Sequence, residues 1–256
     1  MPIPSRLRED PVHNPSGSTG FSLKHWIWRV ILGFICATAV WPLAAEERHL
    51  YRETRGDDSS TYLWTMVAAG DLYRITFQSL RETFVNHCDA SGLTLRWRLQ
   101  GERIEAEARR EGDAIVLAGR HEGEPVERRI EIGDEPWYQP LSYSLRRFAR
   151  SGKIATPFWM LRPDTLTAVR LKAERVGREP LVTANGPALA VRVRISTTGL
   201  LTGIWKADYW FAADSGVFLR YEGVNGPPGS PKTVVELLER DVVPTAGAAD
   251  LESGQR

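Results

Sequence analysis

The sequence has few of the residues that mark the common classes of functional site. It contains two cysteines in 256 residues, too few for a disulfide framework or a zinc ribbon. The formal net charge is +1, so bulk charge gives no support for nucleic-acid binding. Hydrophobic residues make up 42% and charged residues 25%, which excludes a disordered chain, a collagen-like chain and a multi-span membrane protein.

Recognisable catalytic motifs are also missing. The sequence has no H-E-x-x-H, no G-x-S-x-G, no Walker A loop and no G-x-G-x-x-G. Beyond residue 45 the histidines are His49, His87 and His121, whose spacing is far from that of metal ligands. We therefore expect no metal, no cofactor and no nucleic-acid partner. Whether the protein is an enzyme stays open, and a non-enzymatic role is favoured.

One short cluster, Asn86–Asp89, does contain residue types used in nucleophilic catalysis. A cysteine nucleophile needs a base within hydrogen-bond reach. His87 and Cys88 are adjacent, and adjacent side chains on a strand point to opposite faces. We interpret the cluster as the end of a strand that runs into a turn.

The N-terminal region predicts export. Lys24 and Arg29 precede an apolar run of eleven residues, 30–40, and small residues follow before the polar start at Glu46. This order predicts a secretory signal peptide over residues 1–45, cleaved after Ala45, and hence a periplasmic protein. The alternative is an uncleaved inner-membrane anchor, in which residues 24–45 contact the membrane, although the apolar segment is short for a span.

Residues 46–243 are predicted to form a single antiparallel β domain. Apolar and polar residues alternate along segments such as 73–77, 189–195 and 217–222, with Gly- and Asp-rich turns between the segments. We expect about eleven to thirteen strands. Strands joined by short hairpins pair with their neighbours, and a sheet of that length must curl, close or split. The predicted class is mainly β: a long meander curled into a half-barrel or β-roll.

One segment interrupts the alternation. Leu141, Leu145 and Phe148 have helical spacing, so an inserted amphipathic helix is predicted near residues 139–151. Such a helix could close one mouth of the curled sheet. Residues 244–256 have no apolar period and are predicted to be disordered.

The aromatic residues of the domain are candidates for either a filled core or an apolar cavity, because a curled sheet can hold a small ligand. Trp205 and Trp210 have opposite parity on one predicted strand, so at most one of them faces inward. The candidate ligand-binding residues are Tyr73, Phe77, Trp97, Trp159, Trp205, Tyr209 and Phe211.

The last third of the domain carries a recognisable pattern. It comprises segments 173–177, 191–195, 204–211 and 214–222. This pattern resembles uncharacterised secreted bacterial domains whose long antiparallel sheet ends in a W-Y/D-G hairpin. The likeness covers residues 48–240 in layout and 165–240 in motif, and here Ser215 separates Asp214 from Gly216. Such domains are similar in shape to periplasmic lipoprotein carriers, which implies an apolar ligand and supplies no catalytic residues.

Three functions remain open from the sequence. The first is non-enzymatic binding of an apolar or amphipathic envelope molecule, such as a lipid. The second is an envelope scaffold or interaction protein with a filled core. The third is an enzyme that acts on an envelope glycan or lipid through a dispersed site. A cavity lined by apolar side chains favours the first, and two converging carboxylates favour the third.

Overall fold

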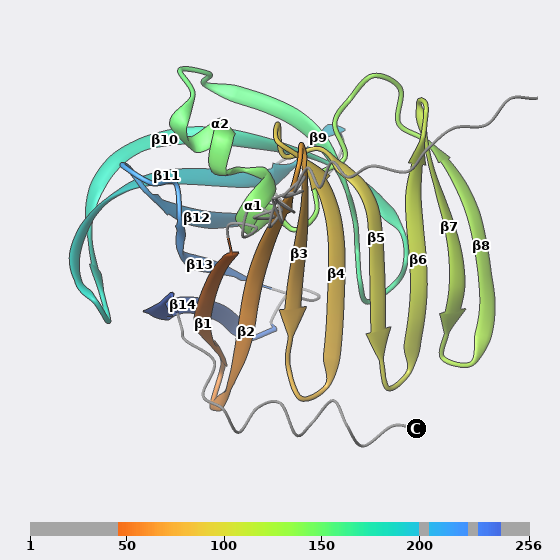
Figure 1. Cartoon of the computed structure of the whole chain (residues 1–256), viewed down its shortest axis with the longest axis horizontal. Coiled ribbons are helices and arrows are strands. Elements are labelled where there is room, and N and C mark those ends of the chain that lie inside the picture. Colours follow the sequence, from red (N-terminus) through yellow and green to blue (C-terminus); the bar gives the residue numbers. More distant parts are fainter. Residues whose placement is uncertain (1–45, 200–204, 225–229, 242–256) are drawn as a thin grey trace, which may run out of the picture. The chain divides into compact units, whose positions relative to one another are not determined.

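The strands of the domain form one antiparallel sheet, as the sequence predicts (Figure 1). The computed structural model describes residues 46–199, 205–224 and 230–241. The predicted signal peptide and the predicted disordered tail lie outside the described residues. No helix among the described residues is long and apolar enough to span a membrane.

Fourteen strands are present in the described residues. The first eight are β1 (Glu46–Arg55), β2 (Asp58–Ala69), β3 (Leu72–Gln78), β4 (Glu82–Asp89), β5 (Thr94–Gly101), β6 (Ile104–Glu111), β7 (Ala114–His121) and β8 (Glu124–Glu131). The other six are β9 (Ala155–Leu161), β10 (Ala168–Thr183), β11 (Gly186–Thr197), β12 (Lys206–Ala212), β13 (Phe218–Val224) and β14 (Lys232–Arg240).

Strands that follow one another in sequence pair in the sheet, except β8 and β9. The order is β8-β7-β6-β5-β4-β3-β2-β1-β14-β13-β12-β11-β10-β9, so the first and last strands of the domain pair with each other. That pairing joins two meanders into a single curled sheet whose end strands are β8 and β9. The predicted curled meander is therefore confirmed.

The predicted number of strands was too low because one turn has unusual chemistry. β3 and β4 are connected through Ser79, Leu80 and Arg81, a turn without glycine, proline or asparagine. The hydroxyl of Ser79 accepts hydrogen bonds from the backbone N–H groups of Arg81 and Glu82, at 3.2 and 3.1 Å. A serine hydroxyl makes the hydrogen bonds of this turn, which lacks the Gly and Asp residues used to predict the other turns.

The predicted helix is present but divided. It consists of α1 (Leu141–Ser144) and α2 (Arg146–Arg150), with Leu145 between them. Its predicted apolar face is confirmed, because Leu141, Leu145 and Phe148 are all buried. The two short helices replace the single continuous helix that the spacing predicted.

Both helices are tied to the same end of the curled sheet. The Tyr143 hydroxyl donates a hydrogen bond to the carbonyl of Asp89, at the end of β4, at 3.2 Å. Arg146 binds the carboxylate of Glu47, at the start of β1, at 2.8 Å. In the β4–β5 turn, a Cβ on Gly92 would lie 2.7 Å from the Ser144 carbonyl oxygen, so only glycine allows this approach. The helices cover this end of the sheet (Figure 1).

Arg146 is held between aromatic and acidic groups. Its guanidinium lies 4.8 Å from the centre of the Trp64 ring. The His49 ring stacks on Trp64, with ring centres 5.3 Å apart. Burial acts to raise the pKa of Glu47. The hydrogen bond with His49 and the charge of Arg146 outweigh burial and lower that pKa to about 2.

The lowered pKa of Glu47 predicts acid sensitivity. Stabilisation by its carboxylate is complete above the unfolded-state pKa of 4.5 and is lost as the pH falls towards about 2. We expect Glu47 to contribute about 1–2 kcal/mol to this loss, after allowance for its partial exposure. Urea unfolding of the wild type and Glu47→Gln between neutral pH and acid should show a flatter pH dependence in the variant. Equal slopes in the two proteins would contradict the assignment.

Two hydrophobic cores fill much of the domain, and β9 separates them. Phe158 of β9 faces the first core, which also contains Tyr209 and Phe211. Leu161 of β9 faces the second core, together with Trp97 and other buried residues of β5, β6 and β7. The end strand β9 therefore packs on both faces, which requires the sheet to roll over itself.

The segment before the helices fastens β9 in place. Gln139 is buried, and its side-chain oxygen accepts hydrogen bonds from the indole N–H of Trp137 at 3.2 Å and from the backbone N–H of Leu161 at 3.1 Å. Its backbone N–H and carbonyl both bind the Thr94 hydroxyl of β5 at 2.7 Å. Gln139 thus links β5 to β9 across the second core.

Candidate functional site

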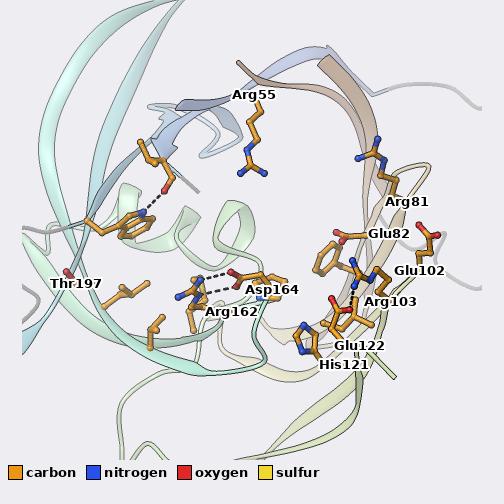
Figure 2. Close-up of a pocket in the computed structure, with 18 residues that line it drawn as sticks. Arg55, Arg81, Glu82, Glu102, Arg103, His121, Glu122, Arg162, Asp164 and Thr197 are labelled. Atoms are coloured by element: carbon orange, nitrogen blue, oxygen red, sulfur yellow. Dashed lines mark hydrogen bonds and ion pairs between the residues drawn. The ribbon is translucent and has the colours of Figure 1, made fainter. Parts of the chain in front are cut away.

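A cavity of about 980 Å³ lies at the end of the sheet opposite the helices (Figure 2). The ends and turns of strands supply its walls: Arg55 ends β1, Glu82 begins β4 and Val224 ends β13. The helices cover the other end, where β1 begins and β4 ends. The curled sheet therefore has one covered end and one end with a cavity.

Eight of the cavity residues are apolar, and they come from both halves of the sheet. Val169 and Met160 are direct cross-strand partners on β10 and β9. The Trp205 indole N–H donates a hydrogen bond to the carbonyl of Val224 at 2.7 Å, which fixes the indole against the end of β13. The apolar lining consists of Phe84, Ile104, Met160, Pro163, Val169, Leu171, Trp205 and Val224.

The rim of the cavity carries both signs of charge. It contains four arginines and four carboxylates, in addition to His121 and Thr197; the charged residues are Arg55, Arg81, Arg103, Arg162, Glu82, Glu102, Glu122 and Asp164. Arg103 pairs with Glu122, and Arg162 pairs with Asp164 with an Nε–Oδ1 distance of 3.1 Å. Figure 2 shows Arg55 and Arg162 pointing towards the middle of the cavity from different walls.

Two carboxylates near the rim are held in partly dry surroundings. Burial raises the pKa of Glu82, and the charge of Arg81 lowers it. Burial also raises the pKa of Glu53. The charge of Glu82 raises this pKa further, and the charge of Arg55 lowers it. Glu82 lines the cavity, and Glu53 does not.

Of the seven predicted ligand-binding residues, Trp205 lines the cavity. Tyr209 and Phe211 share the predicted face but contact each other and other rings in the first core. Trp210 lies on the opposite face, where its indole N–H binds Glu179 at 2.6 Å.

The other four predicted residues have packing roles. Trp97 is fully buried in the second core, and Trp159 packs against it from β9. Phe77 contacts Tyr62, and Tyr73 contacts the ring of Tyr143 at the covered end, with ring centres 5.5 Å apart. The aromatic residues of the described part of the chain mainly fill the interior.

The charged rim was not predicted from the sequence. Glu102, Arg103 and Glu122 belong to the β5–β6 and β7–β8 turns, where charged residues ordinarily indicate solvent exposure. Their shared location depends on the curl of the sheet. A usable signal is that two turns at one end of the meander contain adjacent Arg and Glu residues, Arg81-Glu82 and Glu102-Arg103.

The cluster around Cys88 is a strand end followed by a turn, as interpreted from the sequence. The thiol is buried, and burial raises the pKa of Cys88 to about 12, so it is protonated at neutral pH. Within residues 46–199, 205–224 and 230–241, no group of three His, Cys, Asp or Glu side chains is placed to hold a metal ion.

The architecture defines a class: a curled antiparallel sheet with helices at one end and a cavity at the other. No protein-family model and no curated protein sequence matches the chain. A solved structure with a similar fold is a β-barrel-like protein of domain of unknown function DUF1849 from Brucella abortus. The two share 13% sequence identity over 79% of this chain and 99% of that chain, with a TM-score of 0.56.

Weaker matches include two further bacterial proteins. The hypothetical lipoprotein YmcC from Escherichia coli has a TM-score of 0.36 and 10% identity, over 78% of this chain and 85% of that chain. A LolA superfamily protein from Nitrosomonas europaea has a TM-score of 0.23 and 7% identity, over 81% and 90%. The resemblance to an uncharacterised bacterial domain, inferred from the sequence, is confirmed at the level of the fold.

Proposed function

We propose that the protein binds an apolar or amphipathic molecule of the cell envelope in the end cavity. The observation that carries this proposal is the apolar wall formed by Met160, Val169, Leu171 and Trp205 inside a charged rim. A volume of about 980 Å³ lies near the upper end of the range for small-molecule sites, about 300–1,000 Å³. Apolar surface that lines a recess gains free energy when a ligand removes it from water.

The proposed setting is the periplasm, and it depends on the export signal predicted in residues 1–45. A scaffold protein with a filled interior is the second candidate. The two packed cores support that candidate, because they account for most of the aromatic residues. The cavity between Phe84 and Val169 has no role in a filled scaffold, and it favours ligand binding.

A neutral apolar dye tests the proposal. N-phenyl-1-naphthylamine becomes fluorescent in apolar surroundings, so we expect saturable fluorescence with one site per chain and a dissociation constant of about 10 µM or lower. Two samples of protein purified without detergent are titrated. One of them is first extracted with organic solvent, which removes any resident ligand. A linear, unsaturable signal in both samples would overturn the proposal and leave the scaffold function.

A further inference from the structure

Two opposite-charge pairs lie on the rim of the cavity, and we call them the rim pairs. Arg103 of the β5–β6 turn binds Glu122 of the β7–β8 turn, and Arg162 binds Asp164 between β9 and β10. The second pair is bidentate, because Nε and Nη2 of Arg162 both donate to the Asp164 carboxylate. Figure 2 shows both rim pairs at the cavity, with Glu82 beside the first of them.

The rim pairs give the cavity little net attraction for a charged head group. The whole rim contains four arginines and four carboxylates, so a charged group that comes close to one sign is also close to the other. An anion that approaches Arg162 meets the carboxylate of Asp164, which is bound to the same guanidinium. Attraction and repulsion therefore largely cancel for a head group of a single charge.

The rim pairs still offer hydrogen bonds to a neutral group. A guanidinium carries more N–H donors than one carboxylate engages, and a carboxylate has more acceptor positions than one guanidinium fills. Asp164 engages Nε and Nη2 of Arg162 and does not engage Nη1. A hydroxyl group both donates and accepts, so it can bind the donor and the acceptor of one pair without separating them.

An apolar surface lies beside these polar groups. The indole N–H of Trp205 is engaged by the carbonyl of Val224, so the ring is left to contact a ligand through its carbon atoms. Met160, Val169 and Leu171 extend this surface as an aliphatic wall. The cavity thus combines an apolar surface with a charge-compensated rim that is rich in hydrogen-bond donors and acceptors.

We propose that the ligand is an amphiphile with a neutral, hydroxyl-rich head group, as in a glycolipid. The hydroxyl groups bind the rim pairs, and the apolar chain lies against Trp205 and the aliphatic wall. This inference rests on the proposed function, since it specifies the head group of the molecule in the same cavity. Binding is non-covalent, and the compensated charge selects against head groups of a single sign.

Displacement of bound N-phenyl-1-naphthylamine tests the head group. The probes are dodecyl maltoside, dodecyl phosphate and dodecyltrimethylammonium, each used below its micelle concentration, and maltose alone. We expect dodecyl maltoside to displace the dye at about fivefold lower concentration than either charged probe, and maltose to be at least about a hundredfold weaker. Equal or tighter binding of a charged probe would overturn the inference. Maltose as effective as dodecyl maltoside would also overturn it, since a free sugar would then be sufficient.

Variants of one rim pair should change the preference between head groups. Asp164→Asn leaves the charge of Arg162 without its carboxylate, so dodecyl phosphate should bind about tenfold tighter and dodecyl maltoside about threefold weaker. Arg162→Gln leaves the carboxylate instead, so dodecyltrimethylammonium should gain by a similar factor. Both side chains are exposed, at 44% and 59% for Arg162 and Asp164, so both variants should fold, which urea unfolding checks.

Glu127→Gln is the matched control for these variants. Glu127 is exposed on β8 and lies outside the cavity, so its replacement removes one carboxylate without changing the rim. This variant should show the same order of probes as the wild type. An unchanged order in both Asp164→Asn and Arg162→Gln would contradict the role of the rim pair.

The outcomes separate this inference from the proposed function. Saturable binding of the dye with no preference for dodecyl maltoside would retain an apolar binding site and reject the hydroxyl-rich head group. Failure of the dye and of every dodecyl probe to bind would reject both.

Discussion

Replacement of Gln139 by leucine is expected to lower the free energy of unfolding by about 2–5 kcal/mol. The Gln139 side-chain oxygen is the acceptor for two buried donors, the Trp137 indole and the Leu161 backbone N–H. Leucine fills a similar volume but accepts no hydrogen bond, so both donors stay buried without a partner. Each such donor costs about 1–3 kcal/mol. Urea unfolding followed by tryptophan fluorescence measures the change.

An exposed glutamine provides the control for this prediction. Gln100 lies on β5 with its side chain in solvent, so Gln100→Leu should change stability by less than about 0.5 kcal/mol. A similarly small effect of Gln139→Leu would show that the link between β5 and β9 contributes little. In that case the hydrogen bonds of Gln139 would not be the main polar contacts that hold the sheet in its rolled arrangement.

Replacement of Val169 by tryptophan is expected to weaken binding of a neutral apolar dye at least tenfold. Val169 faces the cavity beside its cross-strand partner Met160, and an indole at this position would occupy the space proposed for the ligand. Because the new side chain enters empty volume, overpacking should be small, and stability should change by less than about 1 kcal/mol. Dye titration and urea unfolding measure the two effects separately.

Val116→Trp is the matched control for the filled cavity. Val116 lies on β7 between the buried residues Ile115 and Leu117, so its side chain is on the other face of the sheet and outside the cavity. This variant should bind the dye as the wild type does. Equal dye affinity in Val169→Trp and the wild type would place the dye elsewhere on the protein.

The local structure of the domain follows closely from its sequence. Alternation along 189–195 gives a strand with Val191, Val193 and Ile195 buried, and helical spacing gives the buried Leu145 between two short helices. These features depend on residues close together in the chain. The Ser79 turn was missed because a hydroxyl group there makes the hydrogen bonds that turn composition does not reveal.

The candidate site depends on contacts between distant parts of the chain. β1 pairs with β14, which brings Arg55 and Val224 to one cavity although 169 positions separate them in sequence. The sequence left the aromatic residues as candidates for either a filled core or a cavity lining, and in the structure Tyr209 and Phe211 meet other rings in the core. The space is left instead where aliphatic residues of β9 and β10 face charged turns, and no local period identifies that location.

The central claim is that the end cavity holds an apolar or amphipathic molecule, and native mass spectrometry tests it most directly. The protein is purified from its own cell envelope without detergent and measured before and after organic extraction. The account predicts a mass above that of the chain, which is lost on extraction, and an apolar or amphipathic molecule in the extract. If the mass is that of the chain alone, and the extracted protein also fails to bind added N-phenyl-1-naphthylamine, the account is contradicted.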